Sequence, residues 1–267
     1  MTTPFVVFGV PSFRGTPERE FFVSWCQTQT ALHEAGIKFD VILLAGDPYL
    51  PKCRNRIVSQ FLSDFPHATD FFFLDDDVGW SPASKVVEFV RRDEDIVFGA
   101  YPKKQDGISF PVTLEMDAFG DLIEKDGLYQ SHLCPTGFMR VKRGVLERMA
   151  MQSSRYYETA PNGTEVLQWN IFEARFVDPV LEALRTTDLD ALPPDMLAMY
   201  LKRAIGLVPG QDIGKWWGED FWFVERWRGM GGICWVDPEI MFTHRGSKAW
   251  SATFGDSIRS VLAQRKR

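Results

Sequence analysis

Residues 71–77 read Phe71-Phe72-Phe73-Leu74-Asp75-Asp76-Asp77, an apolar run followed at once by three carboxylates. A short continuous apolar run bounded by charge predicts a buried strand of a parallel sheet. Ligands of such sheets bind beyond the carboxyl ends of the strands. Adjacent carboxylates repel one another, and their oxygens favour hard divalent cations such as Mg²⁺ or Mn²⁺. The stretch therefore predicts a cation site at a sheet edge, with a solvated acidic turn as the alternative.

The hundred residues around this stretch alternate strand and helix patterns. Further strands are expected at Phe5–Val10, Lys38–Leu44 and Asp95–Ala100. Helices are expected where apolar residues recur at helical spacing: at Phe21, Trp25, Thr28 and Leu32 before Gly36, at Cys53–Phe65, and after Ser81, a predicted cap for a helix whose first turn holds Pro82. This alternation predicts an α/β fold, with a mostly parallel central sheet flanked by helices.

Beyond residue 105 glycines interrupt the pattern, and the segments become short. Helices are expected near Val145–Met149, Met196–Ala204 and Phe221–Arg228, and a further strand at Ile233–Val236. Repeats, low-complexity tracts and linkers are not recognisable. We therefore expect a single domain over residues 1–267, with a helix or tail from residue 251.

Composition excludes several classes of protein. The chain has 267 residues, of which 45% are hydrophobic, and a net charge of −6, which argues against a protein that coats nucleic acid or an anionic membrane. Short basic clusters at Arg91-Arg92, Lys103-Lys104 and Lys142-Arg143 are expected to be solvated faces or, less often, a local patch. The four cysteines form no C-x-x-C pair, and apolar runs fall short of the roughly 20 residues that span a bilayer. These features predict a cytoplasmic protein.

Several motifs in chain order resemble those of GT-A fold glycosyltransferases, in particular the family-2-like enzymes. The acidic run matches their D-x-D signature, and the other matching segments are Gly9-Val10-Pro11-Ser12, Arg54-Asn55-Arg56, Cys134–Met139, Gly218-Glu219-Asp220 and Thr243-His244-Arg245-Gly246. The resemblance implies a Rossmann-like nucleotide-diphospho-sugar transferase domain. Residues 1–104 would bind the nucleotide sugar and residues 105–250 would face the acceptor, with 151–210 setting acceptor choice.

The resemblance also implies roles on the donor side. Asp77 and Asp75 would contact Mn²⁺ or Mg²⁺ with His244 as a further metal ligand, and Asp75 and Asp76 would lie at the nucleotide sugar, a UDP-sugar in the first instance. The remaining donor-binding residues would be Pro11, Ser12, Arg54, Asn55, Arg56, Arg245 and Lys248. Guanidinium groups at a helix N-terminus suit a diphosphate. A structural histidine and a basic helical turn packed by its side-chain stems are the alternatives.

In inverting members of this family, the aspartate that Asp220 matches is the general base, with Glu219 beside it in the catalytic motif. A carboxylate that caps the helix dipole is the alternative for Asp220. The acceptor or donor sugar would contact Thr136, Gly137, Trp216, Trp217 and Gly218. Core packing is expected for at least one of the two tryptophans.

Other functions stay open at this point. A nucleotidyltransferase also joins a nucleotide-binding sheet to acidic metal ligands, but leaves Asp220 and His244 without a role. A non-catalytic carbohydrate-binding domain explains the tryptophans but not the carboxylates. The segment Gly99–Lys104 also resembles soluble glycosyltransferases of phages and large viruses, some of which modify hydroxymethylated DNA bases. A glycan acceptor is preferred to DNA, and a viral enzyme would act in the host cytoplasm.

Overall fold

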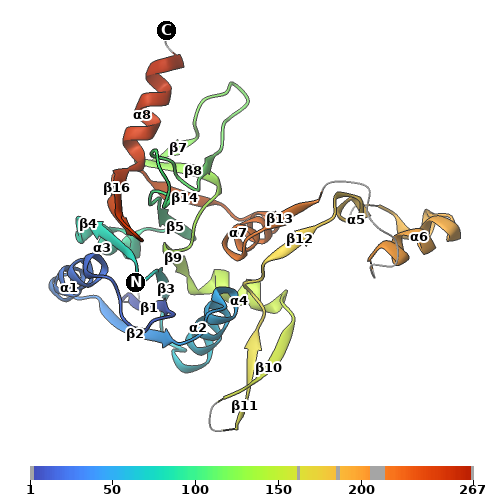
Figure 1. The fold of residues 1–267 in the computed structure, drawn as a ribbon, viewed down its shortest axis with the longest axis horizontal. Coiled ribbons are helices and arrows are strands. Elements are labelled where there is room, and N and C mark those ends of the chain that lie inside the picture. Colours follow the sequence, from blue (N-terminus) through green and yellow to red (C-terminus); the bar gives the residue numbers. More distant parts are fainter. Residues whose placement is uncertain (1–2, 161–162, 185–186, 205–213, 266–267) are drawn as a thin grey trace.

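The fold is built on a large central sheet, seen edge-on among the helices in Figure 1. The computed structural model describes residues 3–160, 163–184, 187–204 and 214–265. The main path of the sheet runs through β2 (Lys38–Ala45), β1 (Phe5–Ser12), β3 (Asp70–Leu74), β9 (Phe138–Lys142), β5 (Ile96–Gly99), β14 (Cys234–Asp237), β8 (Leu128–Leu133) and β6 (Thr113–Leu114), with β7 (Glu124–Lys125) paired to β8. Strands β9 and β8 run against the others. The sheet is thus mixed but mostly parallel, which confirms the predicted α/β class.

The alternation expected in the first hundred residues is confirmed, with two local corrections. Helices α1 (Arg19–Glu34), α2 (Leu50–Asp64) and α3 (Ser84–Arg91) follow β1, β2 and β4 (Val78–Ser81). Helix α2 begins three residues earlier than predicted, so Arg54 lies in its second turn, not at its N-terminus. Ser81 ends β4 and caps no helix, because β4 pairs with β15 (Met241–Arg245). The predicted site segment Thr243–Arg245 lies within β15, which also pairs with β16 (Ala249–Thr253).

Strand β9 was not predicted. It enters antiparallel between β3 and β5, so the Cys134–Met139 segment is a loop only as far as Gly137. Phe138 and Met139 are fully buried strand residues, because they fill the two faces of the sheet. Helix α4 (Arg143–Met151) follows directly.

Side chains of the sheet divide the core into two layers, because successive residues of a strand point to opposite faces. Phe71 and Phe73 pack with α2, α4 and α7 (Glu219–Gly229). Phe72 and Leu74 pack with α1 and α3 on the other face. The phenylalanine run therefore fixes β3 at the centre of both layers, with its carboxyl end at the acidic residues.

Two projections leave this body (Figure 1). One is the hairpin of β10 (Arg155–Thr159) and β11 (Glu165–Trp169). The other is an arm that holds β12 (Arg175–Val177), β13 (Lys215–Trp217), α5 (Pro179–Ala183), the 3-10 turn Leu189–Ala191 and the predicted helix α6 (Pro194–Ala204). Between Arg175 and Ala204 the described side chains all keep solvent exposure. Part of the stretch predicted to set acceptor choice, residues 205–210, lies outside the described residues.

The C-terminal segment forms α8 (Phe254–Arg265), as far as residue 265, where the described chain ends. Throughout the ranges that the structure covers, no helix is long and apolar enough to cross a membrane. The single-domain organisation stays a prediction.

Candidate functional site

Several of the predicted site residues converge where β3 and β5 end and α7 begins. Asp75, Asp76 and Asp77 follow β3 directly, and Gly218 caps α7, whose first two residues are Glu219 and Asp220. The carboxyl ends of neighbouring strands meet at one sheet edge, so residues distant in sequence lie together there.

A buried arginine joins the two acidic groups. Arg54 is 2% exposed, and its Nη2 lies 3.2 Å from Oδ1 of Asp75 while its Nε lies 3.5 Å from Oε1 of Glu219. Burial opposes the positive charge, but the two carboxylates outweigh it and raise the pKa of Arg54 above its usual value. Its Nη1 is buried and has no hydrogen-bond partner among the described residues. A buried unpaired donor costs free energy, so a hydrogen bond from this atom to a ligand would be favourable.

Asp75 is held by a residue that sequence reasoning missed. Tyr101 follows β5 and is buried, with its hydroxyl 3.4 Å from Oδ2 of Asp75, while it accepts a hydrogen bond from the Gly137 amide at 3.2 Å. A Cβ on Gly137 would lie 2.3 Å from Oδ2 of Asp75, so glycine is required there. Burial raises the pKa of Asp75 against the opposing charge of Arg54. The position of Tyr101, just after a central strand, was the signal available in the sequence.

Asp76 contacts the first strand. Its Oδ2 accepts a hydrogen bond of 2.6 Å from Ser12, and burial raises its pKa against that bond. Strand β1 extends two residues beyond the predicted end at Val10, so the segment Gly9–Ser12 is strand and Pro11 and Ser12 are buried. Gly9 has a packing role, since a Cβ there would lie 2.3 Å from the Phe71 ring.

Asp77 faces the small sheet formed by β4, β15 and β16. His244 Nε2 lies 3.5 Å from its Oδ1, and the Lys104 ammonium donates to its Oδ2. Burial favours the neutral acid, but hydrogen bonds from His244 and Lys104 win and lower the pKa of Asp77. His244 Nδ1 lies 2.8 Å from the Pro102 carbonyl. Because a carbonyl oxygen only accepts, Nδ1 donates that bond. Nε2 then donates to Asp77 when the ring carries both protons, whereas in the neutral ring its lone pair is free for a cation.

This donor set fits a hard or borderline divalent cation that receives its other ligands from phosphate and water. Carboxylate oxygens and one imidazole nitrogen suit Mn²⁺ or Mg²⁺. Within the part of the chain that the structure describes, no three His, Cys, Asp or Glu side chains form a complete metal cluster. Asp77 with His244 would therefore hold the ion at one side only, and Lys104 neutralises the carboxylate in its place.

Asp220 has an unusual acidity. Burial and the neighbouring Glu219 raise its pKa to about 6, although Arg54 acts in the opposite direction. Its Oδ1 accepts a hydrogen bond of 2.8 Å from the Phe221 amide, so the side chain is fixed at the first turn of α7. A half-buried carboxyl with a pKa near 6 is suited to accept a proton near neutral pH.

Four predicted donor residues are engaged elsewhere. The Asn55 side chain forms hydrogen bonds with both the carbonyl and the amide of Phe172. The Nη1 atom of Arg56 lies 3.7 Å from Oδ2 of Asp47, and its Nε lies 3.6 Å from Oε2 of Glu158. Arg245 Nη1 lies 3.8 Å from Glu20, and Lys248 pairs with Asp106. The structure thus brings Arg54, but not these four side chains, to the carboxylates.

The predicted acceptor residues separate into buried and exposed groups. Thr136 is fully buried with an unpartnered Oγ1 among the described residues, and Trp217 is 8% exposed. Trp216 is 67% exposed. As expected, one tryptophan serves packing.

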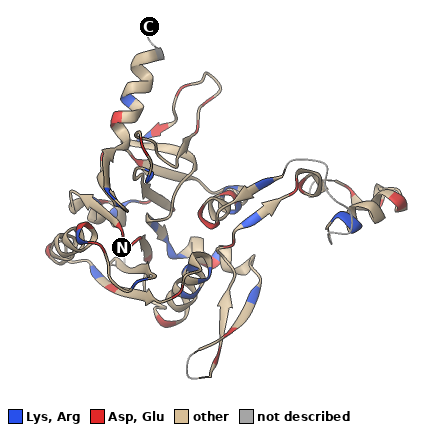
Figure 2. Ribbon diagram, in the orientation of Figure 1, with Lys and Arg blue, Asp and Glu red and all other residues tan. Residues whose placement is uncertain are grey.

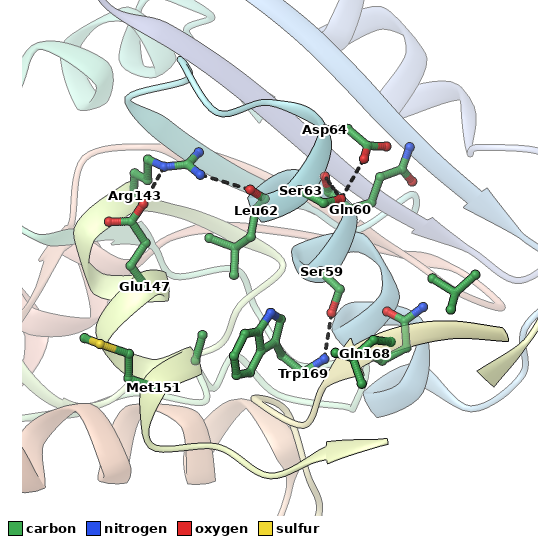
Figure 3. Close-up of a pocket in the computed structure, with 13 residues that line it drawn as sticks. Ser59, Gln60, Leu62, Ser63, Asp64, Arg143, Glu147, Met151, Gln168 and Trp169 are labelled. Atoms are coloured by element: carbon green, nitrogen blue, oxygen red, sulfur yellow. Dashed lines mark hydrogen bonds and ion pairs between the residues drawn. The ribbon is translucent and has the colours of Figure 1, made fainter. Parts of the chain in front are cut away.

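A separate pocket of about 870 Å³ lies between α2, α4 and β11 (Figure 3). Leu62, Met151 and Trp169 contribute to its wall, and Arg143 at its edge pairs with Glu147 at 2.6 Å. It shares no residue with the carboxylate site. Volume alone is therefore a poor guide to the chemistry here, since the carboxyl groups of Asp75, Asp77 and Asp220, whose pKa values are shifted, lie at the sheet edge.

Charge is mixed over the surface, with basic and acidic residues interspersed along most elements (Figure 2). The predicted basic clusters contribute to different contacts: Lys104 to Asp77, Lys142 to Asp93 at 3.8 Å, and Arg91 to the Ala35 carbonyl. They do not act as one patch.

No protein-family model and no curated protein sequence matches this chain. Among solved structures, A197 from STIV is similar over 94% of this chain and 90% of its own, at 14% identity and a TM-score of 0.48. A glycosyltransferase involved in glycosylation of the major capsid of PBCV-1 covers 79% of this chain and 80% of its own, at 16% identity and a TM-score of 0.31. A Bacillus anthracis protein described as a putative glucose-1-phosphate thymidylyltransferase is similar over 83% of this chain and 94% of its own, at 11% identity and a TM-score of 0.32. At such distances we base function on the site itself.

Proposed function

We propose that this protein is a divalent-cation-dependent glycosyltransferase that moves a sugar from a nucleoside diphosphate sugar to an acceptor hydroxyl. A UDP-sugar is the first candidate for the donor. One observation carries the proposal. The buried Arg54 joins Asp75, a candidate cation ligand, to Glu219, which lies next to Asp220, whose pKa is about 6. The candidate cation ligands and a carboxyl suited to accept a proton thus lie at one edge of the sheet.

In the proposed reaction, Asp220 accepts the proton of the acceptor hydroxyl as its oxygen attacks the anomeric carbon. The bond from that carbon to the diphosphate oxygen breaks, and the nucleoside diphosphate leaves with the electron pair. A cation held by Asp77 and His244 would neutralise charge on the diphosphate. Arg54 donates a hydrogen bond from Nη1 to a diphosphate oxygen of the nucleotide sugar, and Tyr101 orients Asp75. Attack opposite the leaving group gives inversion.

The cation and donor are tested by measuring release of nucleoside diphosphate from UDP-, GDP- and TDP-sugars with Mn²⁺, with Mg²⁺ and with chelator. We expect cation-dependent turnover of one donor and at least a hundredfold loss in Asp77→Ala. Turnover that survives both chelator and this substitution would contradict the proposal.

The base is tested with Asp220→Asn. This variant is expected to bind the donor normally and to lose transfer by two to four orders of magnitude, the usual contribution of a general base. An undiminished rate would remove Asp220 from that role. Magnetic resonance of the product then identifies the anomer, and retention would contradict the single attack. Pyrophosphate release from a nucleoside triphosphate and a sugar phosphate would instead identify a nucleotidyltransferase.

A further inference from the structure

An exposed aromatic pair projects from the β12–β13 ribbon. Phe176 and Trp216 are directly opposite each other in the antiparallel register, and they are 53% and 67% exposed. Opposed residues share one face of a ribbon, and the next residue along points to the other face. Trp217 accordingly faces inward and is buried.

The ribbon that carries the pair makes contacts on both of its faces. The Phe176 ring covers the backbone of Gly214, where a Cβ would lie 2.0 Å from the ring. On the opposite face, Lys215 Nζ lies 3.6 Å from the centroid of the Trp217 ring, and the Arg175 guanidinium lies 4.9 Å from that of Trp222. The Arg175–Trp222 contact joins the ribbon to α7, which limits the entropy lost when a sugar ring stacks on the exposed face.

The ribbon leads straight to the proposed base. Strand β13 ends at Trp217 and Gly218 caps α7, so Trp216 precedes Asp220 by four residues. The backbones of these two residues are at most about 14 Å apart. A short chain of sugar rings stacked on Phe176 and Trp216 would reach the carboxylate of Asp220.

The chemistry of this face favours a neutral sugar. Its two side chains offer apolar ring faces, and both basic residues of the ribbon, Arg175 and Lys215, stack on the opposite face. A nucleic acid strand would need cations beside the aromatics to bind its phosphates. We infer that Phe176 and Trp216 form a platform on which a neutral saccharide acceptor stacks, so that its terminal hydroxyl faces Asp220. The inference rests on the proposed function and adds Phe176, which no sequence motif indicated.

Binding to the full chain tests the platform. Neutral trisaccharides of hexose and of N-acetylhexosamine are titrated calorimetrically, beside an oligothymidylate as the nucleic acid probe. We expect one saccharide to bind, Phe176→Ala and Trp216→Ala each to weaken it about tenfold, and Trp216→Phe to restore part of the loss. Phe119→Ala removes an aromatic that is 91% exposed elsewhere, and should change nothing. The inference would be overturned if no saccharide bound, if both alanine variants bound the saccharide as tightly as the natural protein, or if the oligothymidylate bound in its place and depended on the two aromatic side chains.

Kinetics separate this inference from the proposed function. If both hold, Trp216→Ala raises KM for the acceptor about tenfold and changes KM for the donor less than twofold. If a saccharide binds and its binding depends on the two aromatic side chains, but no nucleotide sugar is turned over, the platform is supported and the proposed glycosyl transfer is contradicted. If the protein turns over nucleotide sugar but Trp216→Ala leaves the KM for the acceptor unchanged, only the platform inference is contradicted.

Discussion

The acidity of one side chain, Asp220, controls when the proposed reaction can run. Its pKa of about 6 means that the carboxylate form is scarce below that pH. We expect kcat/KM to fall tenfold per pH unit below about 6 and to level off above it. Glu219 raises this pKa, so Glu219→Gln should move the acidic limb to lower pH. A pH–rate profile with the same limb in both proteins would contradict this coupling.

The same carboxyl carries a cost in stability. A folded-state pKa of about 6 lies above the ordinary 3.8, so the folded protein must ionise a half-buried acid as pH rises through 6. The full shift corresponds to roughly 3 kcal/mol, and solvent screening reduces it to about 2 kcal/mol. Asp220→Asn should therefore be more stable than the natural protein at pH 7 and equal to it below pH 4. Urea unfolding at both pH values measures the difference, and a variant that is less stable at pH 7 would oppose it.

At the scale of the element, β3 supports both layers of the core. Phe72 stacks on Phe8 at 5.4 Å between ring centroids and meets Phe138 edge-on at 5.0 Å. Phe72→Ala should lower the free energy of unfolding by about 3–5 kcal/mol, because a large cavity opens in a fully buried site. Chemical denaturation provides the measurement, and a loss below about 1 kcal/mol would mean that the layer repacks.

The turn before β9 links the fold to the site. In Gly137→Ala the new Cβ would meet Oδ2 of Asp75 at 2.3 Å and the Tyr101 hydroxyl at 2.5 Å. Displacement of Asp75 should reduce donor turnover at least tenfold while the circular dichroism spectrum stays native. Gly144→Ala is the matched control, since a Cβ there meets no atom within 4 Å. Equal activity in both variants would show that the position of Asp75 is unimportant.

At the scale of the whole molecule, ligand binding should stabilise the fold by mass action. A nucleoside diphosphate with Mn²⁺ at about 100 times its dissociation constant adds about 2.7 kcal/mol, which corresponds to a rise in Tm of roughly 5 °C. Asp77→Ala should abolish the rise, whereas Asp93→Ala, a fully exposed carboxylate, should preserve it. Thermal scans with each ligand alone complete the comparison. A rise that Asp77→Ala retains in full would place the ligand elsewhere.

The sequence by itself determined the β3 strand, the acidic run at its end, the strand and helix alternation through residue 100, and a helix over Phe221–Arg228. Each follows from a local pattern of apolar spacing or capping, which acts over a few residues. Only the tertiary structure decided that β9 enters between β3 and β5, and that Arg54 joins Asp75 to Glu219. It likewise placed Tyr101 beside Asp75, Lys104 on Asp77, and Phe176 opposite Trp216. Such pairings join residues tens to more than a hundred positions apart, and the sequence pattern around any one of them does not specify its partner.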